Sequence, residues 1–427
     1  MNLPAATASG RPPTPPAGGP NILWIVTTQW RAQAAGYAGD ANARTPHLDA
    51  LEATAVNFAQ AVTPHPFGPF ARAALLTGIP SPENGVRAYF DPLPPEARTV
   101  AHALGERGYA TAFFGKWHLF RRDPAAPMVG PAHAKIVVPP ACRGGFAHWE
   151  GFESGFLLND PWLHGTGLPE PVRFHGYQSD VICDRAAAWI AQAGNRIPEV
   201  KSPWFVVVSL EPPHPPYDAP AAGVAPRAPG AITLPANVPL GGEAEARARR
   251  ELAGYYAHLE ATDRAIGRLL AGVPAAGTIV AVTSVHGDMH GAHGLFRKGW
   301  PHEESVRVPL LVRGAPRGDP RAGRRDGAAV SLVDLFRWTL DWAGVPGATG
   351  TGTDSEGRRI SMPSVVPLPH QCDRAWRGWR TPARKLVVNA DGTPWLFFQL
   401  DRDPGERRNL AGEPAHAAEI AALSGRL

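Results

Sequence analysis

Cationic and polar side chains follow four short apolar runs of the sequence. The runs are "ILWIVT", "ATAFFG", "FVVVS" and "TIVAVTS", and the residues that follow them include Thr28, Gln29, Lys116, His118, His214 and His286. Histidines and lysines bind anions, transfer protons and stabilise oxyanions. A site built from such residues suits acid and base chemistry on a negatively charged molecule.

The apolar runs are typical of buried strands, because they are short, β-rich and lie between segments with helical spacing. Strands are predicted at 21–28, 109–115, 204–210, 277–285 and 306–314, and helices within 45–55, 98–107, 179–193, 246–273 and 329–345. This alternation predicts an α/β fold with helices on both faces of a sheet. Functional residues of such sheets gather beyond the carboxyl ends of the strands, so we expect the side chains above to lie close together.

The composition divides the chain into three parts. Residues 1–20 are rich in Pro, Ala and Gly, which predicts a disordered tail and no secretory signal. An α/β domain is predicted over 21–345. A small α+β domain is predicted over 346–427, where two β-rich runs flank an Asp-Gly turn ahead of a helix. The Gly-, Ser- and Pro-rich stretch 346–369 predicts a linker or a long surface loop.

The composition also limits the partners and the compartment. The chain has 427 residues, 44% of them hydrophobic, and its formal charge of +4 is spread along the sequence. That charge indicates neither nucleic acid nor a membrane surface as a partner, and no apolar run is long enough to span a bilayer. Cys142, Cys183 and Cys372 fit neither a metal site nor a disulfide framework, which favours a cytoplasmic protein with incidental thiols.

Ten phrases of the sequence, in register, resemble the motifs of one family. They are "PNILWIVTTQWR", "RTPHLDAL", "RAALLTG", "GERGYATAFFGKWHL", "PPHPPYDAP", "YYAHLEATDRAIGRLL", "TSVHGDMHGAHGLFRKG", "EESVRVPLLVRG", "VSLVDLF" and "LDRDPGERRNLA". Together they are similar to the sulfatase family of the alkaline-phosphatase superfamily, which includes arylsulfatases and phosphonate monoester hydrolases. The resemblance implies a central mixed sheet flanked by helices, with a small C-terminal α+β domain.

The resemblance also implies a chemistry. In the family, acidic residues hold a divalent cation, usually calcium, which orients the ester as a Lewis acid. A cysteine or serine oxidised to formylglycine supplies the hydrated aldehyde that attacks sulfur or phosphorus. Lysines and histidines bind the remaining oxygens and assist proton transfer.

This chain departs from the family at the position of the nucleophile. Anchoring the family motif on Arg72 and "LLTG" places Gly68 at that position, and Phe70 replaces the proline of the motif. Glycine has no side chain to oxidise or to attack with. This alignment therefore removes covalent catalysis by the family's route.

The acidic ligands of the cation are replaced as well. "TTQWR" has Thr28 at the first acidic position and "SVHGD" has Val285 at the second, which leaves Gln29 and His286. Calcium usually takes about six to eight oxygen ligands, several of them carboxylates, so we predict no metal and no other cofactor. A transition ion is the alternative, although the spacing after a strand points its candidate ligands apart. Those ligands are His286, Asp288, His290 and His293.

The cationic half of the family's pocket remains. Predicted catalytic residues are Lys116, His118, His214, His286 and Lys298, and predicted anion-binding residues are Thr28, Gln29, Trp30 and Arg72. Since the acidic partners are gone, the histidines and lysines are expected to have lowered pKa values until an anion binds. Aromatic residues crowd the same loops and predict an apolar ligand body if several of them line the cavity. These are Trp30, Phe67, Phe70, Trp117 and Trp300.

Three functions fit these residues. The first is an enzyme that keeps the sulfatase fold and acts on a small anionic molecule by acid/base or acyl chemistry, without metal or formylglycine. The second is a noncatalytic relative that binds an anionic ligand or a protein partner. The third keeps the hydrolysis of sulfuric or phosphoric esters through an unusual nucleophile such as Thr28. The first is favoured, because the acids are lost selectively while the cationic positions stand.

Overall fold

A large mixed sheet forms the centre of the protein. The computed structural model describes residues 19–195, 202–314, 321–345 and 356–427. The strands of the central sheet are β1 (Asn21–Thr27), β2 (Val56–Val62), β3 (Ala110–Lys116), β4 (His148–Phe152), β5 (Trp162–Gly165), β6 (Val172–Arg173), β7 (Trp204–Ser209), β8 (Thr278–Ser284), β9 (Leu310–Arg313) and β10 (Arg324–Ser331). Within the described ranges their order is β10-β2-β9-β8-β1-β7-β3-β4-β5-β6.

Four parallel strands in the middle of this sheet position the predicted site residues. β1 pairs in parallel with β7 on one side and with β8 on the other, and β3 pairs in parallel with β7. Trp24 of β1 lies opposite Val207 and Ala281, and β1 is buried on both faces, as its continuous apolar run predicts. The carboxyl ends of these four strands therefore meet at one edge of the sheet. β9 runs antiparallel to both of its neighbours, which makes the sheet mixed.

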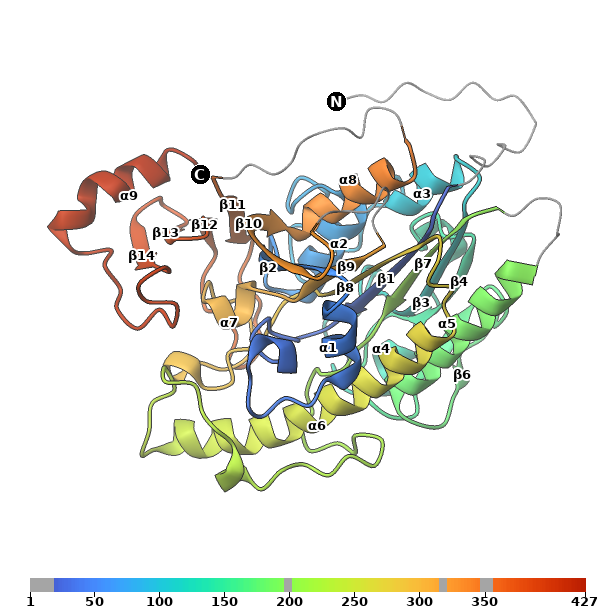
Figure 1. Cartoon of the computed structure of the whole chain (residues 1–427), viewed down its shortest axis with the longest axis horizontal. Helices are drawn as coiled ribbons and strands as arrows, with labels where there is room; N and C mark the ends of the chain where they lie inside the picture. Colours follow the sequence, from blue (N-terminus) through green and yellow to red (C-terminus); the bar gives the residue numbers. More distant parts are fainter. Residues whose placement is uncertain (1–18, 196–201, 315–320, 346–355) are drawn as a thin grey trace.

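Helices cover both faces of the sheet, which confirms the predicted fold class. Their bounds are α1 (Pro46–Glu52), α2 (Gly68–Thr77), α3 (Val100–Gly105), α4 (Pro131–Ala134), α5 (Gln178–Asn195), α6 (Glu243–Ala271), α7 (Glu303–Val306), α8 (Leu332–Trp342) and α9 (Ala417–Ser424). Helices α2, α3 and α8 pack in one apolar core, and α1, α5 and α6 pack in another on the opposite side of the sheet (Figure 1). None of the helices in the described ranges is long and apolar enough to cross a membrane.

A small antiparallel sheet follows at the C-terminal end of the chain. Its strands, in order, are β11 (Arg358–Met362), β12 (Trp376–Arg380), β13 (Arg384–Asn389) and β14 (Pro394–Gln399). Helix α9 contacts β13, and the sheet lies beside β10 and α7 (Figure 1). The Trp376 indole nitrogen donates to the carbonyl oxygen of Gly299 at 2.8 Å, so this sheet holds the loop that carries Lys298.

Three local predictions need correction. Strand β11 lies inside the stretch 346–369, because pairing with β12 outweighs its Gly- and Pro-rich surroundings. Helix α8 begins only at Leu332, where the Asp334 carboxylate accepts from the Ser331 N–H at 2.9 Å, and the preceding residues belong to β10. Strand β9 is shorter than the predicted 306–314, because the short helix α7 and Pro309 precede it. The predicted tail lies outside the described residues except at its last two positions.

Candidate functional site

The side chains that follow the central strands line one buried cavity. Its volume is about 20 Å³, which is room for about one water-sized group. Predicted site residues in its wall are Thr28, Gly68, Lys116, His118, His214, His286 and Lys298. They come from the ends of β1, β3, β7 and β8, from the first residue of α2, and from the loop before α7. Sequence reasoning therefore grouped these residues correctly in space.

Strained backbone holds two of the site residues. Gln29 follows β1 with a φ of 68°, and His118 follows β3 with a φ of 58°. Few residues other than glycine adopt this left-handed region, and it costs about 1–3 kcal/mol, so the surrounding packing must impose it. Such strain clusters at functional sites, and here it turns the chain sharply at the strand ends.

A buried ion pair joins two of the central strands. Lys116 Nζ lies 2.6 Å from Glu211 Oε1, and the side chains are 1% and 0% exposed. Burial lowers the pKa of Lys116 to about 8, although the Glu211 carboxylate acts in the opposite direction. Glu211 was missed by the sequence analysis, although it follows β7 as His214 does. The expectation that the cationic groups have no acidic neighbour is therefore corrected for Lys116.

Lys298 makes no ion pair with a residue in the described part of the chain. Its ammonium nitrogen lies 2.7 Å from Gln29 Oε1 and 2.9 Å from His214 Nε2. Burial and the nearby Lys116 charge lower the pKa of Lys298 well below its ordinary value. The amide nitrogen of Gln29 donates to the carboxylate of Asp288, which also accepts from the Tyr217 hydroxyl at 2.7 Å. Gln29 thus links the amine to a buried acid without an ion pair.

Within the described ranges, several buried nitrogens of the cavity wall, and of Arg72, which bonds Thr28 of that wall, lack a hydrogen-bond partner. Among the described residues, both ring nitrogens of His118, Nε2 of His286, and Nε and Nη1 of Arg72 make no hydrogen bond. Leaving such a group buried and unpaired costs about 1–3 kcal/mol. Burial, together with nearby Lys and Arg charges, lowers the pKa values of His118, His214 and His286 well below their ordinary range. The lowered pKa values of the histidines agree with the expectation from the sequence. The unpaired nitrogens can donate hydrogen bonds to an oxyanion.

The glycine at the family's nucleophile position faces the same nitrogens. A Cβ added to Gly68 would lie 2.9 Å from His118 Nδ1 and 3.1 Å from Arg72 Nη1. Arg72 donates from Nη2 to the Thr28 hydroxyl at 2.8 Å, and Thr28 in turn donates to the Leu210 carbonyl at 2.9 Å. The Thr28 hydroxyl therefore accepts one hydrogen bond from the protein and donates another. Gly68 itself has no side chain that could attack a substrate.

The residues at the family's cation positions do not fit a divalent ion. Thr28 is hydrogen-bonded as above, the Gln29 oxygen accepts from the Lys298 amine, and Val285 packs in the apolar core. Asp288 is the carboxylate that Gln29 bonds, and Gln29 and Tyr217 already occupy one of its oxygens. A site for calcium would need about six oxygens including several carboxylates.

The alternative transition-ion ligands do not come together either. The His290 ring packs 4.2 Å from that of Tyr255, and the His293 ring stacks on that of His302 at 4.4 Å. His286 faces the cavity, and Asp288 bonds Tyr217. Their spacing along the loop turns them to different neighbours, as the alternation predicts.

The aromatic residues divide between the core and the cavity wall. Trp30 donates its indole N–H to the Ala34 carbonyl at 2.9 Å inside an apolar core, so it supports the loop and does not line the cavity. Phe67 does line the cavity, whereas Phe70 and Trp117 lie in the other core and Trp300 packs against it. Two lining rings were not foreseen. They are Tyr89 and Phe156, and the Phe156 ring stacks on His214 at 4.4 Å.

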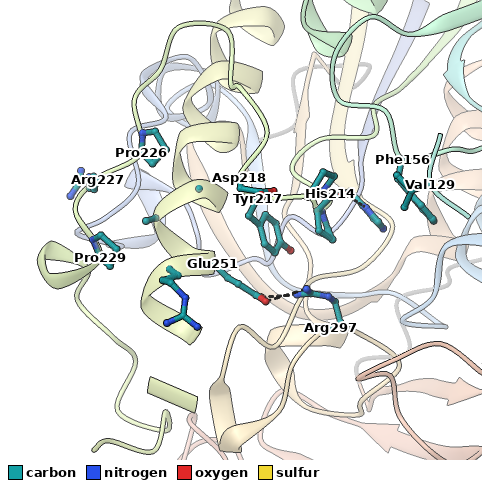
Figure 2. Close-up of a pocket in the computed structure, with 15 residues that line it drawn as sticks. Val129, Phe156, His214, Tyr217, Asp218, Pro226, Arg227, Pro229, Glu251 and Arg297 are labelled. Carbon is teal, nitrogen blue, oxygen red and sulfur yellow. Dashed lines mark hydrogen bonds and ion pairs between the residues drawn. The ribbon is translucent and has the colours of Figure 1, made fainter. Parts of the chain in front are cut away.

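A larger cleft adjoins the small cavity. It has a volume of about 820 Å³ and shares His214 and Phe156 with the cavity. Figure 2 shows these two side chains on one side of the cleft and Pro226, Arg227 and Pro229 on the other. Arg297 and Glu251 both line the cleft and form an ion pair at 2.6 Å (Figure 2). The cleft has room for the body of a small molecule, one oxygen of whose charged group could enter the cavity.

Comparison with known proteins gives the class to which this fold and site belong. The sequence model of the Sulfatase family matches residues 20–345. The chain is 33% identical to the ulvan-active sulfatase of Formosa agariphila over 414 residues, which cover 92% of this chain and 78% of that protein. The chain belongs to the sulfatase family.

Further relatives and solved structures extend this likeness. The arylsulfatase of Clostridium perfringens is 24% identical over 94% of this chain and 92% of its own length. The crystal structure of the putative sulfatase yidJ of Bacteroides fragilis superposes with a TM-score of 0.81 at 24% identity, over 100% of this chain and 96% of that one. The phosphonate monoester hydrolase of Agrobacterium radiobacter gives a TM-score of 0.71 at 21% identity, over 95% and 94%. These structures confirm the fold.

Proposed function

We propose that this protein binds the anionic group of a small molecule in the cavity beside Gly68 and acts on it by acid/base chemistry, without formylglycine and without a divalent cation. One observation carries the proposal. Six cationic side chains converge at the cavity or bond its lining residues, while the positions for the nucleophile and the acids hold Gly68, Thr28 and Val285. The six are Arg72, Lys116, His118, His214, His286 and Lys298.

The side chains divide into two roles. Arg72, Lys116 and Lys298 hold the oxyanion, because guanidinium and ammonium groups form charge-assisted hydrogen bonds with it. His118 transfers the proton, since both of its ring nitrogens are free of hydrogen bonds within the described residues and burial keeps it neutral. His214 bonds the Lys298 amine and its ring lies in the wall of the adjoining cleft. Isomerisation, elimination, condensation and acyl transfer on an anionic molecule are the reactions that such a set serves.

Two other functions have their own support. A noncatalytic anion-binding protein fits the loss of the nucleophile and of the acids. Hydrolysis of a sulfuric or phosphoric ester fits the names of two similar proteins, an ulvan-active sulfatase and a phosphonate monoester hydrolase. It would need another nucleophile, and Thr28 is a poor one because its hydroxyl already donates to Leu210.

Titration calorimetry with sodium sulfate and sodium phosphate in the presence of EDTA tests the binding step. We expect saturable binding to the wild type. Hydrogen bonds to charged groups contribute about 1.5–3 kcal/mol, so Arg72→Met should weaken sulfate binding by at least about tenfold. Arg98→Gln is the control, because that side chain is 52% exposed and pairs with Glu106 at the surface. A requirement for calcium, or unchanged binding by Arg72→Met, would contradict the proposal.

A comparison of product formation separates the enzyme from the binding protein. Once a substrate is found, His118→Asn should abolish turnover while sulfate still binds. A protein that binds sulfate yet turns over none of a broad panel of anionic substrates favours the noncatalytic alternative.

The thiols support the predicted compartment. Cys142, Cys183 and Cys372 are all free, and the last two are buried. Free thiols are usual in a reducing compartment, so we propose that the protein works in the cytoplasm on a small anionic partner.

A further inference from the structure

The amine of Lys298 lies in the cavity wall between two polar groups. Its nitrogen is 2.7 Å from Gln29 Oε1 and 2.9 Å from His214 Nε2. With the rest of the described chain it makes no further hydrogen bond and no ion pair. What the amine offers to a ligand therefore depends on whether Gln29 and His214 accept hydrogen bonds from it or donate to it. The other hydrogen bonds of these two residues decide this.

A buried carboxylate fixes the orientation of the Gln29 amide. The amide nitrogen donates to Asp288, whose carboxylate also accepts from the Tyr217 hydroxyl at 2.7 Å. An ionised carboxylate can only accept hydrogen bonds, so the NH₂ group of the amide must face Asp288. The amide oxygen then faces Lys298 and accepts a hydrogen bond from it.

The backbone fixes the ring of His214 in a similar way. Its Nδ1 lies 2.7 Å from the Pro215 carbonyl oxygen, which can only accept, so Nδ1 carries the ring proton. Burial and the nearby lysine charges lower the pKa of His214 well below its ordinary value, which keeps the ring neutral. A neutral ring with its proton on Nδ1 has a lone pair on Nε2. That nitrogen therefore accepts a hydrogen bond from the Lys298 amine.

Lys298 thus donates to both neighbours, and these two bonds use every N–H of a neutral amine. Burial, together with the Lys116 charge, lowers the pKa of Lys298 well below its ordinary value and so favours the neutral form. A neutral amine has two N–H groups and one lone pair, so the lone pair is what remains for a molecule in the cavity. A desolvated lysine next to another cation is a typical nucleophile toward carbonyl compounds.

The size of the cavity limits the carbonyl compound. The cavity holds about 20 Å³, so it takes one oxygen of an anionic group and no more. A carbon that the amine can attack must then be bonded directly to that group. An α-oxo acid meets this condition, because its carbonyl carbon is bonded to its carboxylate. The rest of the molecule has room in the cleft, which shares His214 and Phe156 with the cavity.

We propose that Lys298 is a covalent nucleophile, whose amine adds to the carbonyl carbon of a bound α-oxo acid and forms an imine. The inference rests on the proposed anion site and names the substrate class of that site. The nitrogen lone pair forms the bond to carbon, and the electron pair of the carbonyl double bond moves to the oxygen. His214 Nε2 takes one amine hydrogen and passes it to this oxygen. The oxygen leaves as water with the second amine hydrogen when the C=N bond forms.

Reductive trapping with glyoxylate tests this on the wild type. Glyoxylate has an aldehyde bonded to a carboxylate, and sodium cyanoborohydride reduces its imine to a stable carboxymethyl amine. Mass spectrometry should find Lys298 modified at pH 7 at least about tenfold faster than Lys135, since an ordinary lysine with a pKa of about 10.4 is almost wholly protonated there. Lys135 is exposed and serves as the reference in the same sample. Equal or slower modification of Lys298 would overturn the inference.

Lys116 is the matched comparison inside the cavity. It lines the same cavity as Lys298, but its amine forms an ion pair with Glu211 at 2.6 Å. The pair favours the charged form, which has no lone pair, so Lys116 should be modified more slowly than Lys298. If Lys116 is modified first, Lys298 is not the nucleophile.

Protection by sulfate shows whether the reactive amine belongs to the anion site. Sodium sulfate at ten times its dissociation constant should slow the modification of Lys298 about tenfold, because about one site in eleven is then free. Modification of Lys135 should not change. If sulfate binds without slowing the modification of Lys298, the imine does not form in the anion site and the inference fails.

Calorimetry separates this inference from the proposed function. Wild type that binds neither sulfate nor phosphate would overturn the proposed function. Wild type that binds either anion, while glyoxylate leaves Lys298 unmodified, would overturn only the imine. Each of these measurements uses the wild type, so none depends on whether a variant folds.

Discussion

Single buried charges decide what the cavity binds. Lys116 and Glu211 form a pair that is nearly neutral overall. Lys116 can therefore donate a hydrogen bond to a ligand, while the net positive charge comes from Arg72 and, once protonated, from Lys298. Burial lowers the pKa of Arg72 to about 10, and it lowers that of Lys298 further from its ordinary value. An incoming anion compensates both groups and so stabilises their charged forms.

Removal of the Glu211 charge should lower the stability of the protein and increase the stabilising effect of sulfate. Glu211→Gln leaves Lys116 buried without its partner, and breaking such a pair costs about 3–5 kcal/mol of stability. Sulfate should then raise the melting temperature of Glu211→Gln by more than that of the wild type, because it supplies the missing negative charge. Urea unfolding with and without sulfate measures both effects.

The control for this change is a surface pair. Glu106→Gln breaks the Arg98 pair, in which both side chains are about half exposed, and should cost less than about 1 kcal/mol. If Glu211→Gln lowers the free energy of unfolding no more than Glu106→Gln does, the buried pair does not contribute to stability.

The sequence indicated the cationic residues but not all of their neighbours. Lys116, His118, His214 and His286 could be predicted because each follows a recognisable strand. Glu211 stands in the same kind of position, and an acid after β7 was a signal that could have been used. Phe156 could not be predicted, because its stack on His214 joins loops that only the folded sheet brings together.

At the level of elements, the contact between β3 and β7 sets the distance between their end groups. Gly115 precedes Lys116 in β3 and lies in register with Ser209 of β7. It has a φ of 102°, and a Cβ there would collide with the Ser209 carbonyl oxygen. Glycine thus lets the two backbones approach closely enough for Lys116 to reach Glu211.

Gly115→Ala should therefore separate the strand ends. We expect a loss of stability above about 1–3 kcal/mol, the usual cost of overpacking, and weaker sulfate binding because Lys116 moves. Gly39→Ala is the control, since Gly39 also has a positive φ of 84° but its Cβ would meet nothing within 4 Å. Urea unfolding should give a clearly larger loss for Gly115→Ala, and equal losses would mean that φ strain alone is responsible.

The elements themselves were predictable to different degrees. The four central parallel strands were placed within about one residue, because strands buried on both faces are continuous apolar runs. The composition around β11 predicts a linker or a long surface loop, because the order of this strand comes from pairing with β12 and not from its own residues. The division of the chain into 21–345 and 346–427 remains a prediction.

At the scale of the whole molecule, the C-terminal segment completes the site. Leu368 lines the cavity, Gln371 accepts from the Lys298 backbone N–H at 3.1 Å, and the Cys372 N–H donates to the Lys298 carbonyl at 3.3 Å. The position of the Lys298 amine therefore depends on both sheets.

Metal removal is a test on the whole protein. Since the residues at the cation positions do not fit a divalent ion, dialysis against EDTA should leave the melting temperature and sulfate affinity unchanged. Elemental analysis should find no stoichiometric calcium, magnesium or zinc, and the protein should not turn over p-nitrophenyl sulfate. Stoichiometric metal whose removal abolishes sulfate binding would contradict the metal-free site.

The pH dependence of stability follows from the same buried groups. The pKa values of His118, His214 and His286 lie well below their ordinary value in the folded protein. As the pH falls below about 6.5, these histidines become protonated in the unfolded chain but stay neutral in the folded protein. The free energy of unfolding should therefore fall with the pH. Urea unfolding at a series of pH values without sulfate measures this loss.

Anion binding should raise the pKa values of these buried groups, so that the folded protein takes up protons when sulfate binds. Sulfate favours the protonated forms of these histidines, of Lys298 and of Lys116, whose pKa without the anion is about 8. Binding above pH 8 must therefore take up a proton, and the affinity should fall as the pH rises through that value. Calorimetry in two buffers of different ionisation enthalpy counts the protons. An affinity that is equal at pH 7 and pH 9, with no proton uptake, would mean that sulfate binds away from these buried groups.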